Sequence, residues 1–342
     1  MWLFYGNQTP AKAVAPTRKY GWNVNEAYTE HELATRPELS NYKTFKYHPN
    51  LSSVKEIDLR SGYPVPPYDQ GQIGSCTAQG WAEIYEFEAH KQQEQYIEMS
   101  RLGFYYQERD AMNKTDEDCG AQIKDGAKII KDQGIGIAQI VPYDTSKYTE
   151  KPPQAYYDDL QYHKAVKVER VKKDINDITQ CLLDGNPINL GIMIYESFES
   201  PDAMSTGVVP DPDTKKEKLL GGHCVNICGK KMIGDKQYFI CRNSWGVGVQ
   251  DKGYFYLSEN FIMGNAGMFG MQPLCSDLWT IKLVHDDVDP NLVETNEQKL
   301  EHVKNLLGVE VADDNLETLF DKLRKLAVDV ESKKAKHETN SV

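Results

Sequence analysis

Long hydrophobic runs are absent from this sequence of 342 residues, and none approaches the roughly 18–20 apolar residues that cross a bilayer. The apolar residues 1–5 are too few for a signal peptide and have no basic segment before them. Positive charge is also scarce, since 39 Lys and Arg against 51 Asp and Glu give a formal net charge of −12. We therefore expect a soluble protein that neither inserts into membranes nor binds nucleic acid.

Cysteines are few, and their number is odd. The seven cannot all form disulfides within the chain, and no two have the Cys-x-x-Cys spacing of structural zinc sites. Cys224 and Cys228 are four residues apart, but they fall in a predicted strand, where such positions lie far from each other. The sequence predicts no metal site and no organic cofactor.

One stretch is rich in glycine and leads into a cysteine. Residues 69–78 read Asp-Gln-Gly-Gln-Ile-Gly-Ser-Cys-Thr-Ala, and a helical pattern over residues 81–90 follows. This pattern places Cys76 at the start of a helix, where unpaired backbone N–H groups and the positive end of the helix dipole favour a thiolate. Six residues earlier, Gln70 carries an amide suited to donate to an oxyanion formed beside Cys76.

A histidine and an asparagine follow far downstream. His223 comes directly after two glycines and lies 147 residues beyond Cys76, and Asn243 lies a further 20 residues on. The other seven histidines lack such a setting. A cysteine, a histidine and an asparagine are the residue types of a nucleophile, its base and the group that orients the base.

These features resemble the papain-like cysteine peptidases, whose nucleophile lies in a Cys-Gly-[Ser/Ala]-Cys-[Trp/Tyr] setting with His and Asn roughly 130–150 residues later. Here residues 73–77 read Ile-Gly-Ser-Cys-Thr, so two of the five positions depart from that pattern. The resemblance also covers Asn-Ser-Trp-Gly at residues 243–246. It extends from about residue 58 to about residue 281.

The resemblance implies a function and a role for nine residues. It implies a cysteine endopeptidase that works through a thioester acyl-enzyme. The implied catalytic residues are the nucleophile Cys76, the acid and base His223, its orienter Asn243 and the oxyanion-hole donor Gln70. The implied substrate-binding residues are Gly120 and Ala121 (a Gly-Gly pair in papain relatives), Gly222, Trp245, and Met271 at the floor of the S2 pocket. An apolar floor would favour a bulky apolar P2 residue over arginine.

Both ends of one disulfide of the family are missing. Papain-like enzymes of secretory compartments usually bridge the residue three before the nucleophile to the Gly-Gly loop, and those places here hold Ile73 and Asp118. We therefore expect a reducing compartment, either cytoplasm or virion. The chain looks more like the bacterial, archaeal and large-virus branches of the family than like lysosomal cathepsins.

The chain divides into three predicted parts. Residues 1–53 form an N-terminal extension, which is either a propeptide gating the active-site cleft or a structural arm. Residues 54–285 form the peptidase domain. Residues 286–342 carry apolar residues at helical spacing, which predicts two amphipathic helices before a disordered end. Those helices either pack on the core or bind a partner or a second copy of the chain.

Periodicity predicts an α+β domain. Helical patterns dominate up to about residue 160, and strand patterns follow from residue 165 onward. Pro152 and Pro153 mark the crossing between two lobes. The papain-like fold implied by this order has a helical N-terminal lobe and an antiparallel sheet or barrel in the C-terminal lobe. The active site lies in the cleft between them, which suits a protein or peptide substrate.

Two other functions stay open at this point. An acyl transferase would use the same Cys-His chemistry with a different acceptor. A non-catalytic module would use a papain-like fold only to bind a partner, although the complete set of four implied catalytic residues argues against it.

Overall fold

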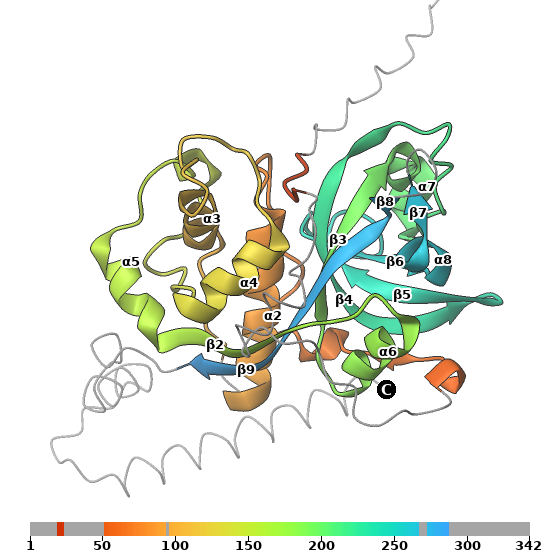
Figure 1. Cartoon of the computed structure of the whole chain (residues 1–342), viewed down its shortest axis with the longest axis horizontal. Helices are drawn as coiled ribbons and strands as arrows, with labels where there is room; N and C mark the ends of the chain where they lie inside the picture. The colour runs from red at the N-terminus through yellow and green to blue at the C-terminus, as the bar shows by residue number, and fades with distance from the viewer. Residues whose placement is uncertain (1–18, 24–50, 94–95, 267–271, 287–342) are drawn as a thin grey trace, which may run out of the picture. The chain divides into compact units, whose positions relative to one another are not determined.

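The computed structural model describes residues 19–23, 51–93, 96–266 and 272–286 (Figure 1). Most of the predicted N-terminal extension, nearly all of the predicted C-terminal part, and Met271 lie outside the described residues. The described chain is the predicted peptidase domain apart from residues 94–95 and 267–271, together with residues 19–23 and 51–53 of the extension.

The first half of the domain is helical, as predicted. Its helices are α2 (Cys76–Gln93), α3 (Arg101–Asp110), α4 (Ile123–Asp132) and α5 (Gln154–Asp159), with the 3-10 turns η2 (Leu51–Ser53), η3 (Arg60–Gly62), η4 (Thr145–Lys147) and η5 (Leu160–Tyr162). Local sequence explains the ends of two helices. The Ser100 hydroxyl caps α3 by accepting from Gly103 N at 3.0 Å. Gly134, with a φ of +102°, follows the end of α4.

The second half is built on an antiparallel sheet. Its strands are β1 (Ile57–Asp58), β2 (His163–Arg170), β3 (Ile188–Tyr195), β4 (Leu219–Ile233), β5 (Lys236–Arg242), β6 (Tyr254–Ser258) and β9 (Cys275–Asp286). The order is β2-β9-β3-β4-β5-β6, with β1 added beside β4. In the described chain β2 and β6 do not pair, so of the two predicted forms, a sheet or a barrel, the structure has the open sheet.

Shorter elements complete the sheet lobe. They are α6 (Ile175–Leu183), η6 (Glu196–Glu199), α7 (Pro201–Thr206), α8 (Glu259–Met263) and the ribbon of β7 (Asn265–Ala266) and β8 (Gln272–Pro273). Helix α6 begins after Asp174, whose carboxylate accepts from Asn176 N at 2.9 Å and caps the helix.

Two large hydrophobic cores correspond to the two lobes, and a smaller third cluster consists of Tyr63, Phe87, Cys228, Ile240 and Tyr256. The first surrounds α2 and includes Trp81, Tyr85 and Phe104. The second lies between the sheet and α6, and includes Leu190, Ile227, Phe239 and Phe255. Strand β9 belongs to both, since Trp279 packs in the first core and Leu278 in the second. Helix α2 lies at the boundary of the lobes in Figure 1, in contact with β4 and β9.

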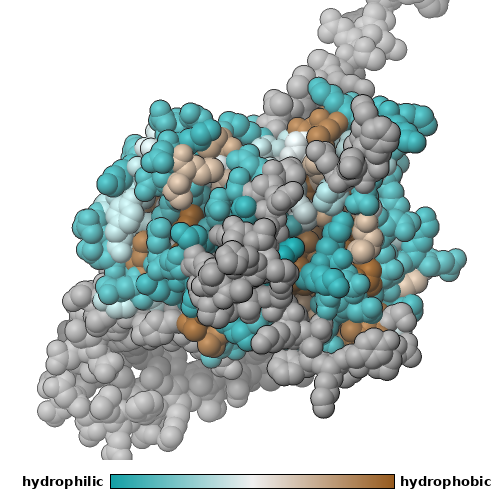
Figure 2. Space-filling model, viewed as in Figure 1, coloured by the Kyte–Doolittle hydropathy of each residue, from teal (hydrophilic) through white to brown (hydrophobic). Residues whose placement is uncertain are grey.

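The described surface is mainly hydrophilic on the face in Figure 2, where apolar residues form small separate patches. The exposed large apolar side chains are Tyr96, Val166, Leu183, Leu219, Val247, Met263 and Leu283, which come from different elements. Among the described helices, none has both the length and the apolar character needed to cross a membrane.

Candidate active site

Cys76 is the first residue of α2, as the glycine-rich loop before it predicts. Gly71 turns that loop with a φ of +65°, a conformation that favours glycine. The Cys76 thiol is fully buried, and its Sγ accepts a hydrogen bond from the backbone N of Cys224 at 3.4 Å. Since Cys224 follows His223 directly in β4, this bond brings the cysteine to the histidine strand.

His223 and Asn243 are bonded to each other at the heart of the site. His223 Nε2 donates to Asn243 Oδ1 at 2.9 Å, and both side chains are fully buried. The other side of the Asn243 amide is held as well, because Nδ2 donates to Gln250 Oε1 at 2.9 Å. With Nε2 in this bond, Nδ1 is the ring nitrogen through which His223 would exchange a proton with a thiol.

Trp245 covers the histidine. Its ring stacks on the imidazole of His223 with centroids 5.1 Å apart and an interplanar angle of 29°. The edge of Phe198 contacts the same indole at 5.7 Å. Trp245 is 1% exposed, so the bond between His223 and Asn243 is shielded from water on this side.

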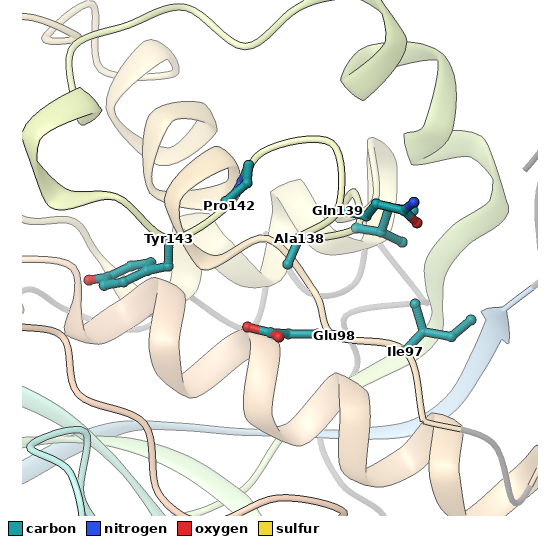
Figure 3. A pocket seen from close by; sticks show the side chains of 7 residues that line it. Ile97, Glu98, Ala138, Gln139, Pro142 and Tyr143 are labelled. Atoms are coloured by element: carbon teal, nitrogen blue, oxygen red, sulfur yellow. The ribbon is translucent and has the colours of Figure 1, made fainter.

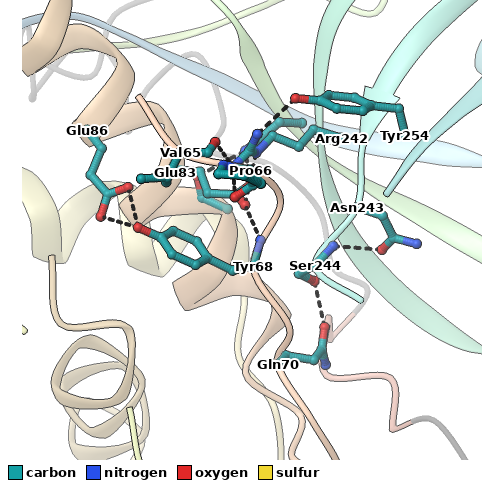
Figure 4. A network of polar contacts seen from close by, with 12 residues as sticks. Val65, Pro66, Tyr68, Gln70, Glu83, Glu86, Arg242, Asn243, Ser244 and Tyr254 are labelled. Carbon is teal, nitrogen blue, oxygen red and sulfur yellow. Dashed lines mark hydrogen bonds and ion pairs between the residues drawn. The ribbon is translucent and has the colours of Figure 1, made fainter. Parts of the chain in front are cut away.

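Gln70 is connected to the same loop that carries the asparagine. Its Oε1 accepts from Ser244 Oγ at 2.6 Å, and its backbone N donates to Ser244 O at 2.8 Å (Figure 4). Because Oε1 accepts from Ser244, the amide is oriented with Nε2 on the side away from Ser244. That Nε2 donates to Ile73 O at 2.9 Å and to Lys19 O at 3.2 Å.

Residues 19–23 lie between the two lobes and contact the predicted substrate-binding backbone. Ala121 N donates to Gly21 O at 2.7 Å, Asn23 N donates to Ala121 O at 2.8 Å, and Trp22 N donates to Gly222 O at 3.0 Å. This contact leaves no room for a side chain at residue 21, because a Cβ there would lie 1.7 Å from Gly74 O. Gly120 also faces the segment, with a φ of +71° and a built Cβ 2.0 Å from Gly21 O.

The ends of this segment are tied to both lobes by side chains. Lys19 forms an ion pair with Asp118, and Tyr20 Oη donates to Glu199. The Tyr20 ring contacts those of His223 and Trp245, each at a centroid distance of 6.1 Å. The segment is therefore seated over the candidate catalytic residues.

The protonation state of Cys76 differs from the one that its helix position predicts. Burial raises the pKa of the thiol to about 12, against opposing hydrogen bonds from the backbone of Cys224, Gly21 and Thr77. Desolvation disfavours the charged sulfur more than the helix N-terminus stabilises it. With residues 19–23 in place, burial therefore favours the neutral thiol over the thiolate that the helix position favours.

Eight of the nine predicted site residues converge here. The four predicted catalytic residues lie together, and Gly120, Ala121, Gly222 and Trp245 surround them or the segment over them. Met271 lies outside the described residues. The sequence analysis missed Trp22, Ser244, Gln250 and Asp277, whose positions depend on contacts with residues far away in the chain.

A separate pocket of about 360 Å³ lies in the helical lobe. It is lined by Ile97, Glu98, Ile137, Ala138, Gln139, Pro142 and Tyr143 (Figure 3). The Tyr143 hydroxyl points away from the other lining side chains in that view and lies 2.6 Å from Ser75 Oγ. Among the described residues no group of three metal-ligating side chains is placed to hold an ion, in this pocket or elsewhere.

Comparisons with known proteins agree with this geometry. A sequence model described as papain family cysteine protease matches residues 53–272. An uncharacterized peptidase C1-like protein of Acanthamoeba polyphaga mimivirus is 35% identical over 287 residues, which cover 78% of this chain and 89% of the viral protein. Xylellain, a cysteine protease from Xylella fastidiosa, has a crystal structure that matches with a TM-score of 0.64 at 29% identity, over 81% of this chain and 100% of that one.

The likeness extends to the fold of more distant enzymes. A procathepsin B from Trypanosoma congolense matches with a TM-score of 0.55 at 14% identity, over 77% of this chain and 85% of that one. The chain belongs to the papain family of cysteine proteases. It is therefore a peptidase that acts on peptides or proteins, and its viral and bacterial relatives confirm the expected branch of the family.

Proposed function

We propose that this chain is a cysteine endopeptidase that forms a thioester acyl-enzyme on Cys76. The observation that carries the proposal is the meeting of three parts: the thiol at the start of α2, the bonded pair of His223 and Asn243, and the Gln70 amide. Each part comes from a different segment of the chain. Acyl transfer to a thiol needs these three parts close together.

In the first step Sγ attacks the scissile carbonyl carbon, and a C–S bond forms as the carbonyl electrons move to oxygen. The backbone N–H of Cys76 and Nε2 of Gln70 donate to that oxyanion. His223 passes the thiol proton to the leaving amine, the C–N bond breaks, and a thioester remains. Water, deprotonated by His223, then attacks the thioester and releases the acid and the thiol. Asn243 keeps the imidazole oriented throughout.

We also propose that the N-terminal segment gates this site. Lys19 O takes the Gln70 donor that an oxyanion would need, and Gly21 to Asn23 take the backbone groups of Ala121 and Gly222 that a substrate would use. A substrate therefore competes with residues 19–23 for the same hydrogen bonds. Departure of the segment would also return water to Cys76 and lower its pKa, since burial is the main cause of the raised value.

Substitution of one glycine tests both proposals in the full-length chain. In Gly21→Ala the new Cβ meets Gly74 O at 1.7 Å, so the segment has to leave. Gly248→Ala is the matched control, because nothing lies within 4 Å of its added Cβ. Labelling of Cys76 by an epoxysuccinyl inhibitor, followed by intact mass, should be faster in Gly21→Ala than in wild type and Gly248→Ala.

Peptide hydrolysis should follow the same order and disappear in Cys76→Ala. With an added amine, the product should be the free acid rather than a transfer product, which separates a peptidase from an acyl transferase. Equal labelling of wild type and Gly21→Ala would contradict the gate. No labelling and no hydrolysis in a folded Gly21→Ala protein would contradict the proposed catalytic role of Cys76.

A further inference from the structure

The hydroxyl of Tyr143 contacts both ends of the loop formed by residues 70–75. It donates to Gln70 O at 2.9 Å and lies 2.6 Å from Ser75 Oγ. Gln70 carries the proposed side-chain donor to the oxyanion, and Ser75 directly precedes Cys76, which carries the proposed backbone donor. One hydroxyl group from a distant part of the helical lobe therefore connects the residues on which both proposed donors depend.

The direction of these hydrogen bonds follows from the donors and acceptors present. A carbonyl oxygen only accepts, so the single hydroxyl hydrogen of Tyr143 goes to Gln70 O. The bond between Tyr143 and Ser75 must then take its hydrogen from Ser75 Oγ. Ser75 Oγ in turn accepts from Gln79 Nε2 of α2 at 3.3 Å. The chain of bonds thus runs in one direction, from Gln79 through Ser75 and Tyr143 to the Gln70 carbonyl.

Burial strengthens this chain of bonds. Gln70, Ser75 and Gln79 are each fully buried. Burial also raises the pKa of Tyr143, against hydrogen bonds with Ser75 and Gln79 and the charge of Arg101, so the phenol keeps its proton at neutral pH. Hydrogen bonds that share hydroxyl groups in a medium of low dielectric polarise and strengthen one another. Loss of the Tyr143 hydroxyl would therefore weaken the bond between Gln79 and Ser75 as well.

The ring of Tyr143 is anchored to the helical lobe. The guanidinium of Arg101 lies over it at 5.0 Å from the ring centroid, and over the ring of Tyr68 at 3.5 Å. The Ser100 hydroxyl donates to Val141 O at 2.7 Å and fixes the chain two residues before Tyr143 at the start of α3. The ring lines the pocket of Figure 3, and its hydroxyl points away from the other lining side chains. A fixed ring thus presents its hydroxyl to a loop on another part of the chain.

We propose that Tyr143 is a positioning residue for acyl transfer, whose hydroxyl keeps the Gln70 amide and the Cys76 N–H aligned on one oxyanion. The inference rests on the proposed function. The two donors are six residues apart in the chain, and both must lie about 3 Å from the same oxygen atom. Misplacement by about 1 Å can cost on the order of 10²-fold in rate. A hydroxyl bonded to Gln70 O and to Ser75 limits such movement.

Tyr143→Phe tests this role, because it removes the hydroxyl and keeps the ring. Tyr156→Phe is the matched control, since Tyr156 is a fully buried tyrosine of the same lobe whose hydroxyl donates to Gln107 Oε1 at 2.8 Å. Both changes are made in the full-length Gly21→Ala protein. Hydrolysis of a fluorogenic peptide should show a kcat about tenfold lower in Tyr143→Phe than in the parent and in Tyr156→Phe, with KM changed less than about twofold.

Alkylation of Cys76 separates positioning from damage to the nucleophile. Iodoacetamide forms a C–S bond at a saturated carbon as iodide leaves, so no oxyanion arises and no donor to it is needed. The alkylation rate should therefore be the same in Tyr143→Phe and the parent. A fall in alkylation equal to the fall in kcat would overturn the proposal, because the thiol itself would be disturbed. An unchanged kcat in Tyr143→Phe, or an equal loss in Tyr156→Phe, would also overturn it.

Amide hydrogen exchange measures the same link without turnover. In the full-length proteins, the peptide that covers residues 69–76 should exchange faster in Tyr143→Phe than in Tyr156→Phe. Equal exchange would overturn the link between Tyr143 and the loop. If Tyr143→Phe does not fold, Ser75→Ala removes the middle hydroxyl of the same chain of bonds and should lower kcat, and an unchanged kcat would overturn the proposal. A Gly21→Ala parent that hydrolyses no peptide would contradict the proposed function, whereas a difference in exchange would keep the link.

Discussion

Ser244 Oγ donates a hydrogen bond to Gln70 Oε1 at 2.6 Å, and Ser244 N donates to Asn243 Oδ1 at 2.8 Å. One residue therefore contacts both the amide bonded to His223 and the amide that we propose donates to the oxyanion (Figure 4). The carbonyl of Ser244 adds a third bond, since it accepts from Gln70 N at 2.8 Å. The loop that carries Asn243 and the loop that carries Gln70 are thus held in a fixed relation.

Loss of the Ser244 hydroxyl should weaken catalysis more than substrate binding. In Ser244→Ala, the Gln70 amide is free to rotate and present its oxygen to the oxyanion. We expect kcat to fall with little change in KM, by less than the roughly 10²–10³-fold loss typical of removing an oxyanion donor, as in Gln70→Ala. Ser205→Ala, on the exposed end of α7, is the control. Steady-state kinetics in the Gly21→Ala background would measure both constants, and an unchanged kcat would contradict the role.

The N-terminal segment should change the pH at which Cys76 reacts. With the segment seated, burial raises the pKa of the thiol to about 12, so the reactive thiolate is scarce at neutral pH. The alkylation rate of wild type should therefore keep rising with pH into the alkaline range. In Gly21→Ala the profile should rise at lower pH, because the thiol is hydrated. Identical profiles for the two proteins would show that the segment does not control the pKa.

Glu108 should make the protein less stable as the pH rises. Burial raises the pKa of this carboxyl to about 8, against the hydrogen bond from Thr77 Oγ1 at 2.7 Å and the charge of Arg109. The folded state therefore holds a proton that the unfolded chain releases above the ordinary carboxyl pKa of 4.5. Stability from this group is lost between pH 4.5 and about 8, by up to about 1.4 kcal/mol per pH unit.

Glu108→Gln should reduce that pH dependence, because glutamine is neutral throughout. Urea unfolding of wild type and variant at several pH values between 5 and 8 would measure it. The exposed residue Glu150, changed to glutamine, is the matched control. A free energy of unfolding whose slope against pH is the same in Glu108→Gln and wild type would contradict the assignment.

Removal of only one partner of the ion pair between Arg242 and Glu83 should strongly lower the free energy of unfolding. Arg242 Nε lies 3.0 Å from Glu83 Oε1, and both residues are buried. The same guanidinium donates to Val65 O at 3.0 Å and Pro66 O at 2.8 Å (Figure 4). Arg242→Met should lower the free energy of unfolding by about 3–5 kcal/mol, since it leaves a buried charge unpaired.

The double variant Arg242→Met with Glu83→Gln should recover part of this loss, because the buried charge is gone. Chemical denaturation of the two single variants and the double variant would measure the coupling. Additive losses in the double variant would show that the pair does not act as a unit.

Several elements follow from local sequence. The apolar spacing and the Asp174 cap define α6, and the glycine-rich loop predicts that a helix begins near Cys76. Other features depend on distant pairing. The long strand β4 begins at Leu219, ahead of His223, because residues 219–222 pair with the end of β3. The sheet stays open rather than closing into a barrel because β2 and β6 do not meet in the described chain.

The sequence by itself led to the proposed chemistry of this protein, because a cysteine, a histidine and an asparagine in the right order and setting are local signals. It also indicated the peptidase family and the two-lobed α+β fold. Only the tertiary structure decided that residues 19–23 cover the site, that burial raises the pKa of the Cys76 thiol, and that Asp277 is buried at a bulge of β9. Burial and strand register decide these features, and both depend on contacts between residues far apart in the chain.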